Sequence, residues 1–180
     1  MHETDAQLVE LAREGDAGAF EELVRRHLRA AHLVALSVVN EPADADDVCQ
    51  DAFLTALEKL DDCRNPNRFR AWLLRIVRNR AISHHRRERV RATLPLDGVM
   101  AKIDQKSDPA RDAVRAELRE RLLKEIQGLS EIQRQVLLLH DLEGWRHREI
   151  AELLGLREGT VRAHLSYARR NMRERLGTLL

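Results

Sequence analysis

Basic and short polar side chains recur along one side of the C-terminal stretch REIAELLGLREGTVRAHLSYARRNMRERL, residues 148–176. Residues 157–176 contain six arginines against two glutamates. Guanidinium groups bind phosphate oxygens, and hydroxyl and imidazole groups can hydrogen-bond base edges in a major groove. A solvated face on a helical bundle is the plainer interpretation, but the excess of arginine favours DNA contact. This side carries Arg162, His164, Ser166, Arg169, Arg170 and Arg173.

A second arginine cluster, in FRAWLLRIVRNRAISHHRR (residues 69–87), has a different pattern. Asn79, Ser83, Arg86 and Arg87 fall at i, i+4, i+7 and i+8, so they share one helical face. That face can meet a phosphate backbone while it offers an amide and a hydroxyl to bases, and the polar loop before it could hold an unstacked base. The pattern favours single-stranded nucleic acid, with duplex backbone binding as the alternative.

The stretch DADDVCQDAFLTAL, residues 44–57, is acidic where the other two are basic. Asp47, Gln50, Asp51 and Leu54 lie at i, i+3, i+4 and i+7 and form an exposed polar ridge. This ridge would repel DNA but not a basic protein, although a merely solvated surface is the alternative. A neighbouring apolar ridge, expected to face the core, consists of Phe53, Ala56, Leu57 and Leu60.

The sequence contains no group of residues typical of catalysis or metal binding. Its eight histidines and two cysteines do not form a cluster with ligand spacing, and His84 and His85 are adjacent on a helix and therefore diverge. There is no glycine-rich phosphate loop and no nucleophile elbow. We expect no enzymatic activity, no metal and no cofactor. We also expect Cys49 and Cys63 to be buried or idle thiols.

Charge is divided sharply along the chain, although the net charge is only +1. Residues 1–62 hold 5 basic and 15 acidic side chains, whereas residues 64–91 hold 10 arginines and one glutamate. Residues 92–180 are close to balance, with 16 basic and 14 acidic side chains. Such asymmetry indicates different partners for different surfaces.

Helices must position these clusters, because apolar residues follow a helical period through most of the chain. Aromatic residues make up only 3% of the chain, which predicts an all-α fold. The segment NEPAD and the run Asn65-Pro66-Asn67 are predicted breaks, with a helix beginning near Pro42. In the C-terminal stretch, Val161, Leu165, Ala168, Met172 and Leu176 form one buried stripe.

We expect two small helical domains, residues 1–91 and 112–180, joined by a flexible linker at 92–111, which contains two prolines and a glycine. The second domain is a predicted helix-turn-helix: HREIAELLG is the first helix, with Ile150, Ala151 and Leu154 inward, and Gly155 adopts the left-handed conformation that closes it. The N-terminus lacks a targeting pattern and no run is long enough to span a membrane, so we expect a cytoplasmic protein without membrane insertion.

These stretches together, in this order and spacing, resemble a bacterial sigma factor of the extracytoplasmic-function class of the sigma-70 family. The resemblance covers roughly residues 8–176. It implies a sigma factor that binds core RNA polymerase at the beta-prime clamp and beta flap, directs it to melted and duplex promoter DNA in a stress or envelope response, and is held by an anti-sigma factor.

The resemblance also assigns residues. Core polymerase would contact Asp47, Gln50, Asp51 and Leu54. A flipped base of the melted minus-ten element would be captured by the loop at 62–68 and the following helix, with contacts from Arg64, Asn65, Asn67, Arg68, Arg75, Arg78, Asn79, Ser83, Arg86 and Arg87. The duplex minus-thirty-five element would be read by Arg157, Thr160, Arg162, Ala163, His164, Ser166, Tyr167 and Arg170.

A stand-alone transcriptional regulator is the competing hypothesis. Its helix-turn-helix would bind duplex DNA, and its N-terminal half would sense a ligand or dimerise. That hypothesis gives no linked roles to the arginines of residues 64–91 and the acidic stretch.

Overall fold

The computed structural model describes residues 3–92, 122 and 124–177, and within them every regular element is helical, as predicted. The first group of elements comprises α1 (Asp5–Arg13), α2 (Ala17–Val39), α3 (Pro42–Glu58), the short 3₁₀ turns η1 (Leu60–Asp62) and η2 (Pro66–Arg68), and α4 (Phe69–Ala92). The second comprises α6 (Glu131–Leu137), the π-helical turn η3 (Leu138–Leu142), α7 (His147–Leu154) and α8 (Glu158–Gly177).

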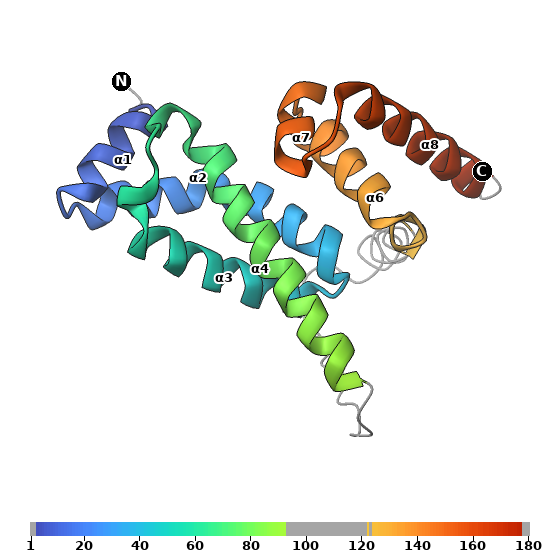
Figure 1. The fold of residues 1–180 in the computed structure, drawn as a ribbon, viewed down its shortest axis with the longest axis horizontal. Helices are drawn as coiled ribbons and strands as arrows, with labels where there is room; N and C mark the ends of the chain where they lie inside the picture. Colours follow the sequence, from blue (N-terminus) through green and yellow to red (C-terminus); the bar gives the residue numbers. More distant parts are fainter. Residues whose placement is uncertain (1–2, 93–121, 123, 178–180) are drawn as a thin grey trace, which may run out of the picture.

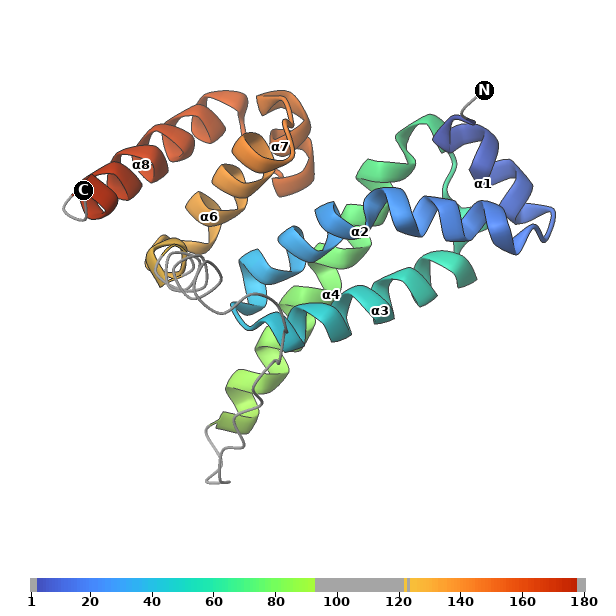
Figure 2. The ribbon, with the colours of Figure 1, turned by 180° about the vertical axis from the view of Figure 1, so that it is seen from behind.

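In the first group, α2, α3 and α4 pack on one another, and α1 packs on one end of α2 (Figures 1 and 2). Leu23, Val34, Leu73 and Val77 are fully buried between these helices. Alanines such as Ala52 let the helix backbones approach closely. The C-terminal half of α4 extends beyond the other helices (Figure 1), and Arg86 and Arg87 in it are exposed.

The breaks follow from local chemistry. Asn40 closes α2 at a left-handed φ of +68°, and Pro42 begins α3 where a missing N–H costs nothing. The run Asn65-Pro66-Asn67, predicted as a loop, contains a 3₁₀ turn instead. Pro66 fixes a helical φ, and the Arg68 amide donates to the Asn65 carbonyl at 2.8 Å.

The helix-turn-helix is present in the second group. Gly155 has φ +68° and ends α7, and the Leu156 amide donates to the Ala151 carbonyl at 2.9 Å. The buried stripe of α8 is confirmed for its first four residues, while Leu176 is partly buried. The inward side of α7 was predicted less well. Leu153 is buried with Ile150 and Ala151 and lines a pocket with residues of the first group, whereas Leu154 is only half-buried.

The two groups pack together: α6 and η3 lie on α2, and α7 lies on α4. Trp145, Arg134 and Gln135 of the second group are buried. Helix α4 continues through Ala92, one residue into the predicted linker; the rest of that linker, and residue 112 where the second domain was predicted to start, lie outside the described residues. No helix in the described ranges is long and apolar enough to cross a membrane.

Candidate polymerase and nucleic-acid interfaces

The predicted polar ridge lies on the outer face of α3. Asp47, Gln50, Asp51 and Leu54 are all exposed, with Leu54 at 55% of its full accessibility. The expected core ridge is only partly correct: Phe53, Ala56 and Leu60 are buried, but Leu57 is 48% exposed. Leu57 lies three residues after Leu54, so it extends the outer face of the helix.

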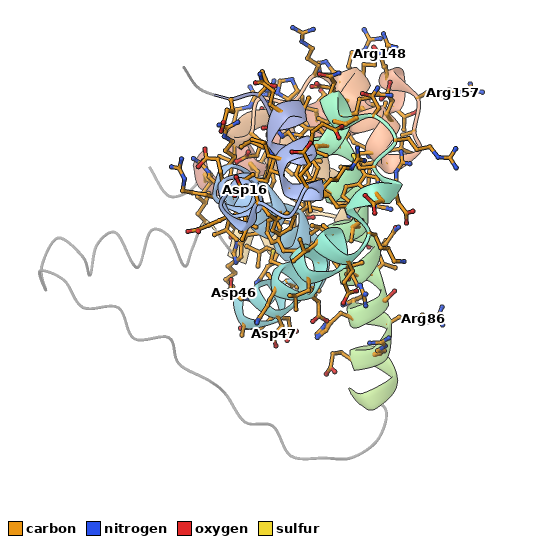
Figure 3. All side chains as sticks on the ribbon, turned by 90° about the vertical axis from the view of Figure 1, so that its left-hand side faces the viewer. Asp16, Asp46, Asp47, Arg86, Arg148 and Arg157 are labelled. Carbon is orange, nitrogen blue, oxygen red and sulfur yellow. The ribbon has the colours of Figure 1, made fainter. Side chains whose placement is uncertain are left out.

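An apolar groove of about 360 Å³ runs beside this ridge, between α2 and α3. Its apolar walls are Phe20, Val24 and Leu28 from α2 and Cys49, Phe53 and Leu54 from α3, with Asp46 and Gln50 at its edge. In Figure 3, Asp46 and Asp47 lie toward the bottom of the view, far from Arg148 and Arg157 at the top right. An acidic edge around an apolar groove suits a basic helix that carries apolar side chains.

The cysteines do not contribute reactive thiols. Cys49 and Cys63 are both free and buried, as predicted. Burial raises the pKa of Cys49 to about 12, which keeps it protonated at neutral pH. Among the described residues, no group of three or more metal-ligating side chains comes together.

The residues predicted to meet the melted strand lie on more than one face. Asn79, Ser83 and Arg87 line a groove of about 340 Å³ between α3 and α4. Within it, Arg80 donates to the Thr55 hydroxyl at 2.7 Å, so this arginine is fixed to α3. Arg86, predicted to share their face, is exposed and does not line the groove (Figure 3).

The polar loop forms a second, larger pocket of about 510 Å³. Its first wall comes from the predicted residues Arg64, Asn65, Asn67, Arg68 and Arg75, together with Trp72. Its opposite wall, which the sequence did not indicate, comes from the second group through Trp145, Glu149, Glu152 and Leu153. The structure therefore brings five of the ten predicted residues to one side of a single cavity, whose other side the second group covers.

Acidic and amide side chains of the second group bind the arginines of the first. Arg68 donates to Glu152, and Arg78 donates to Gln135 at 3.2 Å. The carboxylate of Glu143 lies 3.3 Å from Arg29 and 3.4 Å from Arg70. These carboxylates bind arginines that would otherwise be free to bind phosphates of a nucleic-acid strand.

Three further contacts hold the groups together. The Arg70 guanidinium lies 4.6 Å above the centre of the Trp145 ring, in cation–π geometry. Arg134 donates to the Asn40 side chain, and Gln127 donates to the Asn40 carbonyl at 3.1 Å. The only signal for this contact in the sequence was a single tryptophan in the polar segment EGWRHRE.

Helix α8, together with Arg157 directly before it, presents the predicted duplex-reading residues on its outer side. Arg157, Thr160, Arg162, Ala163, Ser166, Tyr167 and Arg170 are exposed, and His164 is half-buried. Arg170 lies 4.9 Å above the ring of Tyr167, so the two side chains form one unit. Arg169 differs because its Nε lies 3.1 Å from the Asp141 carboxylate, which orients it toward η3.

A basic, exposed second helix of a helix-turn-helix defines a DNA-binding protein, and comparison with known families makes this more specific. Residues 23–91 match the family described as sigma-70 region 2, and residues 119–172 match sigma-70 region 4. The chain is also 32% identical over 176 residues to the ECF RNA polymerase sigma factor SigM of Mycobacterium tuberculosis, covering 98% of this chain and 86% of that protein. It is 33% identical over 178 residues to the ECF RNA polymerase sigma-E factor of Escherichia coli, covering 92% and 91%.

The chain therefore belongs to the sigma-70 family and, within it, to the ECF class of RNA polymerase sigma factors. Among solved structures it resembles CnrH in complex with the cytosolic domain of CnrY, with a TM-score of 0.71, 31% identity and 97% of each chain covered. The stand-alone regulator is not favoured, because both family regions occur in one chain.

Proposed function

We propose that this chain binds core RNA polymerase and directs it to promoters, with residues 1–91 acting on the melted minus-ten element, residues 92–111 as the linker, and residues 112–180 acting on the duplex minus-thirty-five element. The chain is not itself an enzyme in this proposal; it gives promoter specificity to the polymerase. The observation that carries the proposal is one chain with an acidic helix for a protein partner and two separate basic surfaces for DNA.

The clamp of the beta-prime subunit would bind the ridge Asp47, Gln50, Asp51 and Leu54 and insert apolar side chains into the adjacent groove. Exposed Leu28 and Leu57 support this, since apolar residues beside an acidic ridge are typical of a protein interface. The beta flap would bind an apolar pocket of about 430 Å³ on the second domain, lined by Leu122, Ile126, Leu137, Leu138, Leu142 and Met172, with Asp141, Arg169 and Arg173 at its edge.

The loop pocket would receive a flipped base of the minus-ten element, which costs a few kcal/mol of unstacking that polymerase contacts must offset. Arg64, Asn65, Asn67, Arg68 and Arg75 would contact that base and its phosphates. Along α4, Asn79 and Ser83 would hydrogen-bond bases, and Arg78, Arg86 and Arg87 would bind phosphates. For these contacts the second domain must move away from the first.

Helix α8 would enter the major groove of the minus-thirty-five element. Residues near its start lie closest to the bases in this arrangement, and later arginines lie near phosphates. The base-reading and phosphate-binding residues would be Arg157, Thr160, Arg162, Ala163, His164, Ser166, Tyr167 and Arg170.

An anti-sigma protein would inhibit this chain by covering its polymerase-binding surfaces. CnrH, which this chain resembles over nearly its whole length, is bound to the cytosolic domain of another protein. The acidic edge and apolar groove of α3 offer such an inhibitor the same features that would attract the polymerase. The stimulus would be a stress or an envelope signal.

Run-off transcription with reconstituted holoenzyme on genomic fragments tests this function. We expect discrete transcripts only when core polymerase and the chain are both present. Leu54→Asp places a charge in the proposed clamp contact and should abolish these transcripts while duplex binding by the second domain survives. A chain that binds its promoter tightly alone and yields no transcripts with core polymerase would instead be a stand-alone regulator.

A further inference from the structure

Helix α1 packs against the loop of the proposed base pocket, although it precedes the residues matched by sigma-70 region 2, which begin at residue 23. The helix is well formed. Thr4 and Gln7 make a capping box at its start, and Leu8 and Val9 are fully buried against the first domain. It is therefore a fixed part of the domain.

The first turn of α1 is tied to α2. The Asp5 carboxylate lies 2.8 Å from Nε2 of the buried His27 and 3.3 Å from a guanidinium nitrogen of Arg26. Two partners on one carboxylate set both the position and the rotation of the helix. This anchor means that the other end of α1 is also held at a defined place.

That other end carries Arg13, whose guanidinium binds the backbone of the loop. One terminal nitrogen, Nη2, donates to the Cys63 carbonyl at 2.7 Å and to the Leu60 carbonyl at 3.0 Å. The second terminal nitrogen donates to Glu10 at 2.9 Å, one turn earlier in α1, which orients the guanidinium. This nitrogen therefore bridges the carbonyls of Leu60 and Cys63, across the turn that the Cys63 amide also closes by donating to the Leu60 carbonyl at 3.1 Å.

The constraint continues into the pocket. The Cys63 thiol lies 3.7 Å from the Asn65 carbonyl, and that carbonyl also accepts the Arg68 amide at 2.8 Å. The path from Arg13 to Arg68 runs through backbone groups and the buried Cys63 side chain, with no long flexible side chain after Arg13 itself. Hydrogen bonds from a charged donor are stronger than neutral ones, and a partly buried carbonyl that loses its donor favours rearrangement.

We propose that Arg13 is a positioning residue for promoter recognition: it fixes the loop backbone at Leu60 and Cys63 and so sets which minus-ten base the pocket accepts. This inference rests on the proposed function, because it requires that the pocket hold a base. Arg13 does not touch the DNA; it acts through the loop.

The test is base selection by holoenzyme reconstituted with the full chain. Wild type, Arg13→Ala, Arg13→Lys and the control Arg25→Ala are assayed on promoters randomised across the minus-ten element. Arg25 is a suitable control because it is another helical arginine paired with a glutamate three residues earlier, Glu22, and its side chain is largely exposed. The readout is the ratio of transcripts from the best base to those from the next base at the most selective position.

We expect this ratio to fall about tenfold in Arg13→Ala, about the effect of one charge-assisted hydrogen bond, because the Cys63 carbonyl loses Arg13 while the Leu60 carbonyl keeps the Cys63 amide as a donor. Arg13→Lys should give an intermediate ratio, because an ammonium group keeps the charge without the planar fork. Arg25→Ala should match wild type. Exchange of the Arg64 and Arg68 amides with deuterium in the free protein should be faster in Arg13→Ala, since both amides bind carbonyls of the loop.

A ratio unchanged in Arg13→Ala overturns the inference, as does an equal loss of transcription from all promoters together with weaker polymerase binding, which would mean a structural role. If Arg13→Ala does not fold, Arg13→Gln, which keeps one amide donor, is judged by the same criteria. If wild-type holoenzyme selects no minus-ten base at all, the proposed function itself fails. If wild type selects a base and Arg13→Ala selects it equally well, only the inference about Arg13 fails.

Discussion

Arg162 is an exposed side chain on the outer side of α8, within the first turns that would face the bases. If it binds a phosphate, Arg162→Ala releases one fewer counterion, so the slope of log affinity against log salt concentration should shrink by about 0.9. Fluorescence anisotropy with duplex minus-thirty-five DNA at several salt concentrations measures this slope, with Arg25→Ala as the control. Parallel lines for Arg162→Ala and wild type would exclude the phosphate contact.

His27 is a buried histidine at the anchor of α1. Burial lowers its pKa below 6.5, with Arg70 and Arg26 acting in the same direction and Asp5 opposing them. The unfolded chain therefore binds a proton near pH 6.5 that folded His27 accepts only at lower pH, so the free energy of unfolding should fall as pH drops below about 6.5. The difference in the free energy of unfolding between pH 7 and pH 5, measured by urea denaturation, should be smaller in His27→Gln than in wild type. An NMR titration of His27 in the folded wild-type chain with a midpoint above 6.5 would contradict this.

At the residue scale, the sequence predicted exposure well and partners poorly. The α8 stripe and the α3 ridge followed from helical spacing alone. Leu57 was wrongly predicted to be buried because it is apolar. Its spacing from Leu54 places it on the exposed face of α3. Arg13 could not be found at all, since its partners are backbone carbonyls about 50 residues away, which have no sequence signal.

Among the elements, the turn of the helix-turn-helix depends on one glycine. Gly155 adopts φ +68°, and a Cβ there would meet nothing within 4 Å, so Gly155→Ala carries only the conformational penalty, roughly 1–2 kcal/mol of unfolding free energy. Gly159→Ala is the matched control, because Gly159 lies in the first turn of α8 with similar open space and no positive φ, and should be neutral or stabilising. Urea denaturation measures both, and equal stabilities would contradict the role of Gly155.

Helices were the most predictable elements. Apolar periodicity, Pro42 and Gly155 predicted α2, α3, α4, α7 and α8, because these signals act over a few residues. The 3₁₀ turn at Pro66–Arg68 was not predicted, because the same proline that interrupts an α-helix also favours a single tight turn. The groove between α2 and α3 was missed since it depends on how two helices pack.

For the whole molecule, the notable feature is that the second domain lies over the proposed base pocket. Trp145 is only 4% exposed, and Glu143 forms ion pairs with Arg29 of α2 and Arg70 of α4. Combining Trp145→Ala with Glu143→Gln removes the cation–π contact and these ion pairs, so the domains should separate and the radius of gyration should rise in X-ray scattering. Glu125→Gln is the control, because Glu125 pairs with Arg175 inside the second domain. Scattering curves that coincide for the double variant and the control would contradict this.

The contact between the two domains could not be predicted from the sequence. A basic stretch and an acidic stretch can each be found in a sequence, but whether they meet depends on the relative orientation of two folded domains. Net charge along the chain correctly separated acidic from basic regions. Residues 92–180 nevertheless looked nearly neutral, although Glu149 and Glu152 line the loop pocket and Glu143 pairs with Arg29 and Arg70 of the first domain.

The most direct measurement compares promoter binding by the free chain and by the chain with core polymerase. The free chain and the chain with core polymerase are each titrated into a fluorescent promoter fragment that carries both elements. One version of the fragment has an unpaired minus-ten region and one is fully paired, and a fragment of scrambled sequence measures nonspecific binding. Specific binding should be weak for the free chain and at least tenfold tighter with core polymerase present. Specific, tight binding of the fully paired fragment by the free chain, unchanged by polymerase, would contradict the division of labour between the acidic helix and the two basic surfaces.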